Sequence, residues 1–367
     1  MSWPGKAAAV LAGCGAAYNI LAIAGALRFR RKHKLPDFTP PVSILKPVRG
    51  RDPHFYEAIR SHALQRYPEF ELIFGIADPL DAAVMDIERL RAEFPYVPIR
   101  MVHTANDAPN GKVGSLEILA REARYGVLLV NDGDILVTPD YLARVVGLLS
   151  DAGTGLVTCL YRGRGSSLAS KAEALGIATE FAPSVLVARL VSEGGFALGS
   201  TMAFRVADLN AIGGFASIRE YLADDYQLGA RIAVTGKRIA LSDTVVETHL
   251  GAGSWRDVWM HQVRWSRTIR VSRTAGYFGY LVTQATFWCA MAAFAGYWRI
   301  AAAGMVIRLL AAAASMSALD YPGNALWLVP LRDLFGLAVW AAGMVGRTVE
   351  WRGLRFRLLS DGRIRPL

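Results

Sequence analysis

The chain has 367 residues, 53% of them hydrophobic and 20% charged, and a formal net charge of +10 at pH 7. This length accommodates one catalytic domain of roughly 200 to 250 residues plus membrane segments, but excludes two large soluble domains. The Arg and Lys residues crowd around apolar segments, so a membrane surface is the expected partner and a nucleic acid is not. Cys14, Cys159 and Cys289 are far apart, so the sequence indicates neither a disulfide framework nor a zinc site, and the catalytic part is expected in a reducing compartment.

The first apolar segment, Ala7 to Leu27, is predicted to be a transmembrane anchor. As a helix, its run of about 21 nearly uncharged residues crosses a hydrocarbon layer of roughly 30 Å. A cleaved signal peptide is the alternative, but it carries its charge before a shorter apolar core. Here the basic residues come after the core, at Arg28, Arg30, Arg31, Lys32 and Lys34. We assign residues 1–34 to an anchor with a basic flank, and the positive-inside rule places the catalytic domain in the cytoplasm.

Between about Pro41 and Leu250, short β-branched runs alternate with amphipathic helical stretches. This pattern predicts an α/β layer fold with a largely parallel sheet, in a domain spanning residues 35–276. The expected strands are Val42–Leu45, Leu72–Ile76, Ile99–His103 and Val127–Val130. The expected helices between them are Tyr56–Gln65, Ala82–Phe94 and Ser115–Arg124. Ligands of such sheets gather at the carboxyl ends of strands, so the chemistry is expected there.

Acidic residues follow two of these strands. Asp78 and Asp81 come after the second, and Asp132 and Asp134 flank Gly133 after the fourth. Oxygen ligands spaced as Asp-x-Asp on a turn suit Mg²⁺ or Mn²⁺, which also takes diphosphate oxygens from a substrate. The alternative for a lone Asp-Gly-Asp is a solvated turn.

Asp224 and Asp225 stand beside each other before an amphipathic stretch, Gln227 to Val234. One interpretation is capping of a helix N-terminus, where Asp is favoured. The other is a general base that deprotonates an acceptor hydroxyl.

Two further positions also carry two interpretations each. Lys112 follows a turn and either reaches a nucleotide or is solvated. His249 stands at a strand end, where it either approaches a metal or makes only a hydrogen bond.

A basic helical face comes next, with Arg264, Arg267 and Arg270 at helical spacing and Trp265 beside them. Such a face next to a membrane either contacts lipid headgroups or clamps a diphosphate.

The C-terminal region, residues 277–346, contains three apolar segments: Tyr277 to Trp298, Ile300 to Leu319, and Leu326 to Gly346. Arg308, Arg332 and Asp333 interrupt them and are costly in lipid unless they face protein or water. The tail, residues 347–367, is rich in Arg and therefore expected on the cytoplasmic side. We expect two segments to cross and one to be interfacial or re-entrant. A buried helical hairpin in a soluble domain is the alternative.

The order of these elements resembles the D…D…D…(Q/R)xxRW signature of family-2-like glycosyltransferases with the GT-A fold. Ser43 to Gly50, Gly111-Lys112, Leu222 to Tyr226 and the tail from Glu350 to Arg357 are closer still to the ceramide glucosyltransferase family, glycosyltransferase family 21. That family also contains bacterial hopanoid-associated enzymes. The similarity runs from about residue 40 to the C-terminus.

The resemblance implies a GT-A domain with an N-terminal anchor and C-terminal membrane helices, on the cytoplasmic face of what would be a bacterial inner membrane. It implies inverting transfer from a UDP-sugar to a lipid acceptor reached from the bilayer. Its leading form is glucose transfer from UDP-glucose to a ceramide-like lipid. N-acetylglucosamine transfer to a hopanoid polyol is the alternative. A processive polysaccharide synthase needs more membrane helices, and a non-enzymatic adaptor needs no acids in catalytic order.

The resemblance also implies a role for each matching position. Asp78 or Asp81 would contact the uridine, and Asp132 and Asp134 would bind the diphosphate and the metal. Asp225 would be the base, and Arg264 and Trp265 would close over the pyrophosphate. Asp224, Gly199 and Ser200 would lie on the acceptor or diphosphate side. The alternative for Gly199-Ser200 is a tight turn. His261 stands where the signature has Gln or Arg; it still donates a hydrogen bond, but its charge depends on pH near neutrality.

Overall fold

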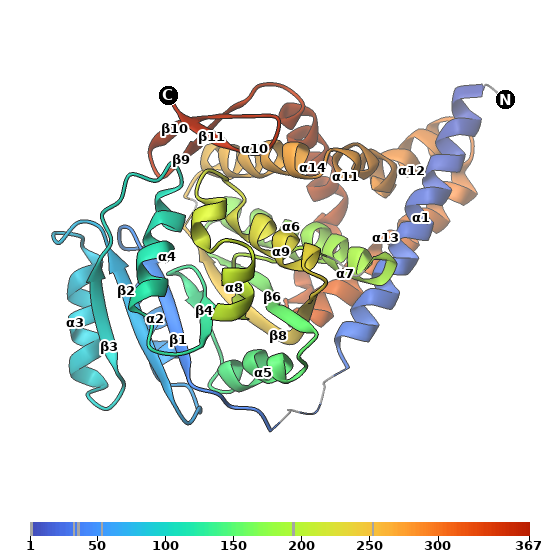
Figure 1. Ribbon diagram of the computed structural model, residues 1–367. Coiled ribbons are helices and arrows are strands. Elements are labelled where there is room, and N and C mark those ends of the chain that lie inside the picture. The colour runs from blue at the N-terminus through green and yellow to red at the C-terminus, as the bar shows by residue number, and fades with distance from the viewer. Residues whose placement is uncertain (1–2, 32–33, 35–36, 53, 193–194, 252) are drawn as a thin grey trace. The chain divides into compact units, whose positions relative to one another are not determined.

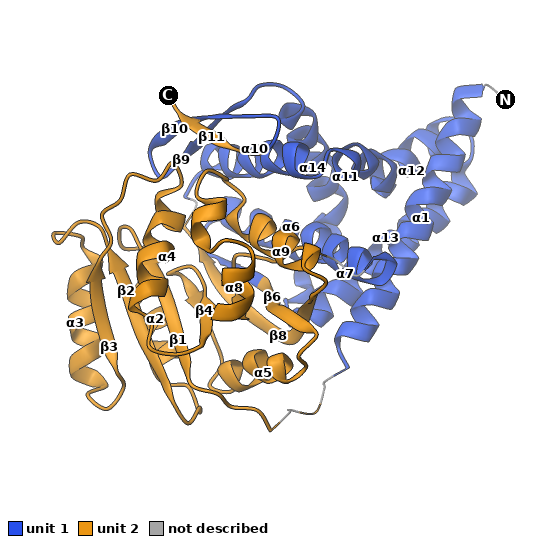
Figure 2. Cartoon of the chain, viewed as in Figure 1, with its two compact units in different colours: residues 1–32, 162–193, 252–361 blue, residues 33–161, 194–251, 362–367 orange. Residues whose placement is uncertain are grey.

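The computed structural model describes all residues except 1–2, 32–33, 35–36, 53, 193–194 and 252. The chain forms two compact units (Figure 2). Unit 1 comprises residues 1–32, 162–193 and 252–361, and unit 2 comprises residues 33–161, 194–251 and 362–367. Lys32 of the expected basic flank and Leu35, where the catalytic domain is expected to begin, lie outside the described residues. The domain boundaries expected from the sequence stay predictions.

Unit 2 is built on an eight-stranded sheet with the order β3-β2-β1-β4-β7-β6-β8-β5 (Figure 1). Its first half is parallel and consists of β1 (Val42–Val48), β2 (Phe70–Ile76), β3 (Ile99–His103) and β4 (Val127–Val130). In the second half β7 (Met202–Arg205) runs antiparallel to β4 and β6 (Thr154–Gly165), and β5 (Ile135–Leu136) runs antiparallel to β8 (Arg238–Leu250). The predicted α/β class and all four predicted strands are confirmed.

Helices cover both faces of this sheet. They are α2 (Phe55–Ala63), α3 (Ala83–Glu93), α4 (Gly111–Glu122), α5 (Tyr141–Gly147), α8 (Val206–Ala211) and α9 (Asp224–Val234), with short 3₁₀ turns η1 (Leu148–Ser150) and η3 (Phe215–Ile218). Successive strand residues point to opposite faces. Ile44 therefore packs in the cluster under α2 and α3, and Leu45 in the cluster under α4 and α9. Full burial of each such side chain contributes about 1.5–3 kcal/mol.

Two helix starts in unit 2 position the candidate site. The Asn110 side chain accepts a hydrogen bond from Val113 N at 3.3 Å, so α4 begins at Gly111, four residues before the predicted start. Lys112 consequently lies in the first turn of that helix. Likewise α9 begins at Asp224, which puts both acids of the Asp224-Asp225 pair in its first turn.

In unit 1, helix α1 (Trp3–Phe29) packs through a seam of small residues. Its buried positions are Gly5, Ala8, Ala12, Gly15, Asn19, Ala22, Gly25 and Ala26. The spacing of three and four residues places them on one face, where small side chains let helices approach closely. An added Cβ at Gly15 would stand 3.1 Å from the Ala285 Cα, so this approach requires glycine.

The seam fixes the direction of two further helices of unit 1. In α13 (Trp298–Ala318), Ala301 packs with Ala8, and Ala311 packs with Ala22, so α13 runs parallel to α1. In α12 (Ala285–Phe294), Ala285 meets Gly15 whereas the later Ala292 packs near Ala8, so α12 runs antiparallel to both.

Four helical stretches of the described chain are long and apolar enough to cross a membrane: Trp3–Phe29, Leu168–Val191, Trp298–Ala318 and Gly323–Gly343. The second consists of α6 (Leu168–Gly176), a π-helical turn η2 (Ile177–Phe181) and α7 (Ala182–Val191), and it was not expected from the sequence. The predicted segment Tyr277 to Trp298 is broken into α11 (Thr274–Gly279), η4 (Tyr280–Thr283) and α12. Which of these stretches cross stays a prediction.

Unit 1 also contains α10 (Trp255–Ser272), η5 (Gly323–Leu328), α14 (Val329–Gly343) and a hairpin of β9 (Thr348–Trp351) and β10 (Leu354–Leu358). The hairpin turns at Arg352 and Gly353, with φ of 52° and 77°. Two successive positive φ values are typical of a tight hairpin turn. The last strand, β11 (Ile364–Pro366), belongs to unit 2.

Candidate active site

The acidic loop after β4 is the centre of the candidate site. Asp132 and Asp134 come just after Val130, the last residue of the strand, as the sequence predicts. Because β1 and β2 run parallel to β4 in the same sheet, their carboxyl ends face the same edge. The loops after these strands therefore share that edge with the acidic loop.

Lys112 joins two acidic segments that are distant in the sequence. Its Nζ lies 2.7 Å from Asp132 Oδ1 and 3.2 Å from Asp224 Oδ2, and its side chain is 16% exposed. Burial alone would lower the pKa of Lys112, but Asp132 and Asp224 outweigh burial and raise it, so the ammonium stays charged. Lys112 is thus an ion-paired side chain rather than a solvated one.

The Asp225 carboxylate is held by the main chain. Gly199 N donates to Oδ2 at 2.8 Å, and Tyr226 N donates to Oδ1 at 2.7 Å. The N-cap of α9 is Ala223, without a side-chain cap, and both acids lie in the first turn of the helix, where the helix dipole favours them; this placement is compatible with both sequence interpretations. Burial and the neighbouring Asp224 raise the pKa of Asp225 to about 6, against the lowering effect of Lys112. A carboxylate with such a pKa suits proton acceptance near neutral pH.

Asp134 is more enclosed than Asp132. It accepts a hydrogen bond from Thr248 Oγ1 of β8. Burial and the nearby Asp132 raise the pKa of Asp134. His249 is the next residue after Thr248, but its ring stacks on His54 with centroids 4.2 Å apart, and its Nε2 is 3.7 Å from Glu247 Oε1.

Within the described residues, no three or more His, Cys, Asp and Glu side chains are grouped to hold a metal ion. His249 is thus not grouped with Asp132 and Asp134 in this structure, and its role toward a metal stays a prediction. Two carboxylates on one loop nevertheless fit Mg²⁺ or Mn²⁺, since Mg²⁺ in particular binds through one or two carboxylates and takes its other oxygens from substrate phosphates and water. The Asp132 side chain is 45% exposed and so is reachable by such a substrate.

The structure separates the two candidates for the uridine ligand. Asp81 accepts hydrogen bonds from Gly50 N at 2.7 Å and Ala83 N at 2.9 Å, which tie the loop after β1 to the start of α3. Asp78 is exposed and accepts one from Leu80 N at 2.9 Å. Both Asp81 oxygens thus have a structural task, whereas Asp78 keeps an oxygen for a ligand.

Gly199 and Ser200 behave differently from each other. Gly199 holds Asp225 through its amide, and a Cβ there would stand 3.3 Å from Asp225 Oδ2. The Ser200 side chain is buried and donates to Cys159 O at 2.9 Å. Its hydroxyl is therefore directed into the sheet.

The His261, Arg264 and Trp265 positions lie on α10, in unit 1. His261 Nδ1 is 2.6 Å from Oε1 of the buried Glu173, and the His261 ring packs edge-on against Trp265 with centroids 4.6 Å apart. Trp265 also contacts Phe181 of η2 at 6.2 Å between centroids. The departure from the (Q/R)xxRW signature is therefore accommodated by a carboxylate partner.

The other two arginines of the basic face support the helix end of α14. Arg267 donates to Val345 O at 3.0 Å and Thr348 O at 2.6 Å, and Arg270 donates to Met344 O and to Gly346 O at 2.6 Å. Cations at a helix C-terminus satisfy its last carbonyls. Arg267 and Arg270 thus cap the end of α14, and contact of this basic face with headgroups or a diphosphate stays a prediction.

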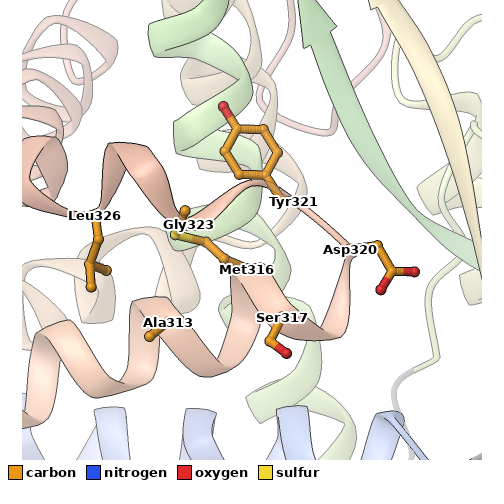
Figure 3. Close-up of a pocket in the computed structure, with 7 residues that line it drawn as sticks. All are labelled: Ala313, Met316, Ser317, Asp320, Tyr321, Gly323 and Leu326. Atoms are coloured by element: carbon orange, nitrogen blue, oxygen red, sulfur yellow. The ribbon is translucent and has the colours of Figure 1, made fainter.

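A separate cavity of about 370 Å³ lies in unit 1 at the C-terminal end of α13 (Figure 3). It is lined by Ala313, Met316, Ser317, Asp320, Tyr321, Gly323 and Leu326. No residue predicted for the nucleotide site lines it.

Two side chains at the acidic loop escaped sequence reasoning. Thr248 lies in a strand far from Asp134 in the chain, and no local pattern links them. Lys46 directly follows the predicted strand Val42–Leu45 and lies within the longer β1 of the structure. A lysine between apolar residues of a buried strand is itself a signal, because lysine is rarely buried without a partner.

The sequence of the chain matches a known family. The model of glycosyl transferase family 21 matches residues 7–364. The chain belongs to glycosyl transferase family 21. The family's match extends over α1 and the C-terminal helices as well as the sheet, so it covers both compact units.

Curated relatives of this family 21 chain include ceramide glucosyltransferases. Ceramide glucosyltransferase 1 of Caenorhabditis elegans is 28% identical over 221 residues, 58% of this chain and 47% of the relative. Ceramide glucosyltransferase 3 of the same organism is 26% identical over 223 residues, 59% of this chain and 48% of the relative. The chain spans about half the length of these relatives.

Among solved structures, a mannosyltransferase from Pyrobaculum calidifontis in complex with GDP-Man and Mn²⁺ is similar with a TM-score of 0.59 and 21% identity, covering 93% of this chain and 97% of that one. The similarity confirms the predicted GT-A type of fold.

Proposed function

We propose that this chain is an inverting hexosyltransferase that moves glucose from UDP-glucose to a ceramide-like lipid, giving a β-glycosyl lipid. Family membership and the relatives named ceramide glucosyltransferases support this reaction. The observation that carries the proposal is the cluster in which Lys112 pairs with Asp132 and Asp224 beside Asp225. It combines a place for a charged diphosphate with a carboxylate of raised pKa.

In this proposal Asp225 takes the proton of the acceptor hydroxyl. The hydroxyl oxygen then forms a bond to the anomeric carbon while the bond from that carbon to the diphosphate oxygen breaks, and UDP leaves with the bonding electrons. A single displacement of this kind inverts the anomeric configuration. The amides of Gly199 and Tyr226 hold the carboxylate in one orientation for this transfer.

The opposite end of the donor is assigned to Asp132, Asp134 and Lys112. Asp132 and Asp134 would hold Mg²⁺ or Mn²⁺, which when bound neutralises charge on the departing diphosphate. Lys112 adds a fixed ammonium next to the same loop. We assign the nucleoside to Asp78, because the main chain occupies both oxygens of Asp81.

The remaining predicted residues belong to the membrane-associated part of the reaction. We propose that Arg264, Trp265 and His261 of α10 act on the pyrophosphate and acceptor side, with the lipid reached from the bilayer. Four stretches of sufficient length and hydropathy support membrane attachment. The basic residues after α1 support a cytoplasmic catalytic face, where UDP-sugars are made.

The test uses the full chain in lipid nanodiscs with radiolabelled UDP-glucose and ceramide. Asp225→Asn should lower kcat by roughly 100- to 10,000-fold, the usual contribution of a general base, while UDP binding in calorimetry stays unchanged. Asp107→Asn, at an exposed acid of the same unit, is the control and should keep full turnover. Full turnover in Asp225→Asn would remove the base assignment.

A separate experiment identifies the acceptor lipid and the transferred sugar. Mass spectrometry of lipids from a host that expresses the chain and is supplied with ceramide or a hopanoid should show a hexosylceramide. An N-acetylhexosaminyl hopanoid instead would establish the alternative reaction, which uses the same acids.

A further inference from the structure

Lys46 is a fully buried lysine to which the proposed reaction assigns no role. It lies on β1, its side chain is 0% exposed, and its Nζ donates to the main-chain oxygen of Asp132 at 3.2 Å. No carboxylate of the described chain lies within ion-pair distance of it. Lysine is almost never fully buried without such a partner.

A polar network anchors the loop next to this contact. His62 Nδ1 lies 2.9 Å from Ala58 O, which makes it the donor and leaves Nε2 to accept from Asn131 Nδ2 at 2.8 Å. Asn131 directly precedes Asp132, and it also reaches Tyr141 Oη at 3.4 Å. Burial and the nearby Lys46 lower the pKa of His62 well below its usual range, so His62 is neutral. Lys46 Nζ thus contacts the main chain of the acidic loop beside a neutral imidazole.

We infer that Lys46 is a positioning residue that holds the Asp132–Asp134 loop, from inside the sheet, in the conformation that binds a divalent cation and a diphosphate. This role rests on the proposed function. Two neighbouring carboxylates repel each other, and Asp134 is enclosed. The hydrogen bond from Lys46 Nζ to the main chain holds the loop in place against this repulsion without occupying a carboxylate oxygen.

The chemistry of the position argues against a purely structural role. The neighbours Ile44 and Leu45 are wholly buried apolar residues. An apolar side chain of the same length would fill the same space without the desolvation of an ammonium. Retaining lysine at this position therefore lowers the stability of the fold. We expect the compensating benefit to be in cation and diphosphate binding by the acidic loop that it contacts.

The experiment measures metal binding and folding stability separately in the full chain. Lys46→Met should weaken Mn²⁺ binding in the presence of UDP by roughly 10- to 100-fold, the usual effect of removing a residue that supports metal ligands. Electron paramagnetic resonance of free Mn²⁺ measures this without turnover. The unfolding temperature of the same variant without metal should be equal to or above that of the unchanged chain.

Ser43→Ala is the matched control on the same strand. Ser43 Oγ donates to Glu71 Oε1 at 2.6 Å and accepts from Tyr125 N at 3.2 Å, away from the acidic loop. Its removal leaves buried polar groups unpaired, so the unfolding temperature should fall while Mn²⁺ binding is unchanged.

The outcomes are distinct. Unchanged Mn²⁺ binding in Lys46→Met, or a fall in unfolding temperature like that of Ser43→Ala, overturns the positioning role alone. Absence of Mn²⁺–UDP binding in the unchanged chain overturns the proposed function, and the role of Lys46 with it.

Discussion

Asp225 is subject to opposing influences in its pocket. Burial and Asp224 raise its pKa to about 6, whereas Lys112 and two amides lower it. The base must be ionised to act, and a raised pKa keeps it protonated up to a higher pH. We therefore expect kcat/KM to be constant above about pH 6 and to fall about tenfold per unit below it, because kcat/KM reports the free enzyme.

A variant of Lys112 provides a check on this pH dependence of kcat/KM. Lys112→Met removes a cation that lowers the pKa of Asp225, so the acidic limb should move to higher pH. Lys237→Met is the control, since Lys237 Nζ donates to Ala152 O and has no contact with the acids of the site. An inflection near pH 4 in the unchanged chain, or one that does not move in Lys112→Met, contradicts the assignment.

At this scale the sequence predicted where the acids stand in the fold, but not the groups that hold them. Asp132 and Asp134 follow a strand and Asp225 lies in the first turn of a helix, while their roles stay predictions. Thr248 and Gly199 act through a hydroxyl and an amide that only the folded sheet brings to Asp134 and Asp225. Such contacts depend on strand pairing, which leaves no local pattern.

Between elements, the charged residues that interrupt the apolar helices pair within unit 1. Arg308 of α13 forms a two-fold hydrogen-bonded pair with Asp333 of α14, at 2.9 and 2.6 Å, and donates to Thr179 O of η2 at 3.0 Å. Both side chains are 7% exposed. The sequence expected these charges to face protein or water, and the structure confirms that they face protein.

This pair gives a prediction about stability. Arg308→Met or Asp333→Leu alone leaves an uncompensated buried charge and should cost about 3–5 kcal/mol, while the double variant should recover most of it. Thermal unfolding in detergent measures the cycle. Arg299→Met, at an exposed arginine of the same helix, is the control. Strictly additive losses in the double variant would show that the two charges do not act as a pair.

The helices show where sequence patterns fail at the scale of elements. The stretch Leu168–Val191 contains Glu173 and Glu180, and these acids made it look less apolar in the sequence. In the folded chain Glu173 pairs with His261 and Glu180 with Arg332, which no local sequence pattern indicates. The antiparallel half of the sheet was likewise not expected. The alternating pattern of a strand indicates that it is a strand, but not whether the strand beside it in the sheet runs parallel or antiparallel.

At the scale of the whole molecule, the direction of α13 constrains the membrane topology. Because α13 runs parallel to α1, its end at Ala318 faces the same side as Phe29 and the basic flank. The turn between α12 and α13 then faces the side of the N-terminus. If α1 and α13 both cross the membrane, we expect the chain to pass twice between the basic flank and Leu319. The first passage is through the broken segment before Trp298 or through Leu168–Val191, and the second is through α13. This arrangement agrees with an arginine-rich tail on the cytoplasmic side.

Single cysteines in a background of Cys14→Ala, Cys159→Ala and Cys289→Ala test this topology in intact bacterial spheroplasts. Phe294→Cys should react with a membrane-impermeant maleimide, whereas Arg30→Cys, Asn324→Cys and Arg355→Cys should react only after permeabilisation. The four positions are exposed, so labelling reports the side of the membrane rather than burial. If Gly323–Gly343 also crossed, Arg355→Cys would react in intact spheroplasts while Asn324→Cys would not. If Asn324→Cys reacted while Phe294→Cys and Arg30→Cys were protected, α13 would have to run antiparallel to α1, against the contacts of Ala301 with Ala8 and of Ala311 with Ala22. Reaction of both Arg30→Cys and Asn324→Cys with Phe294→Cys protected would instead invert the whole orientation and contradict the cytoplasmic flank.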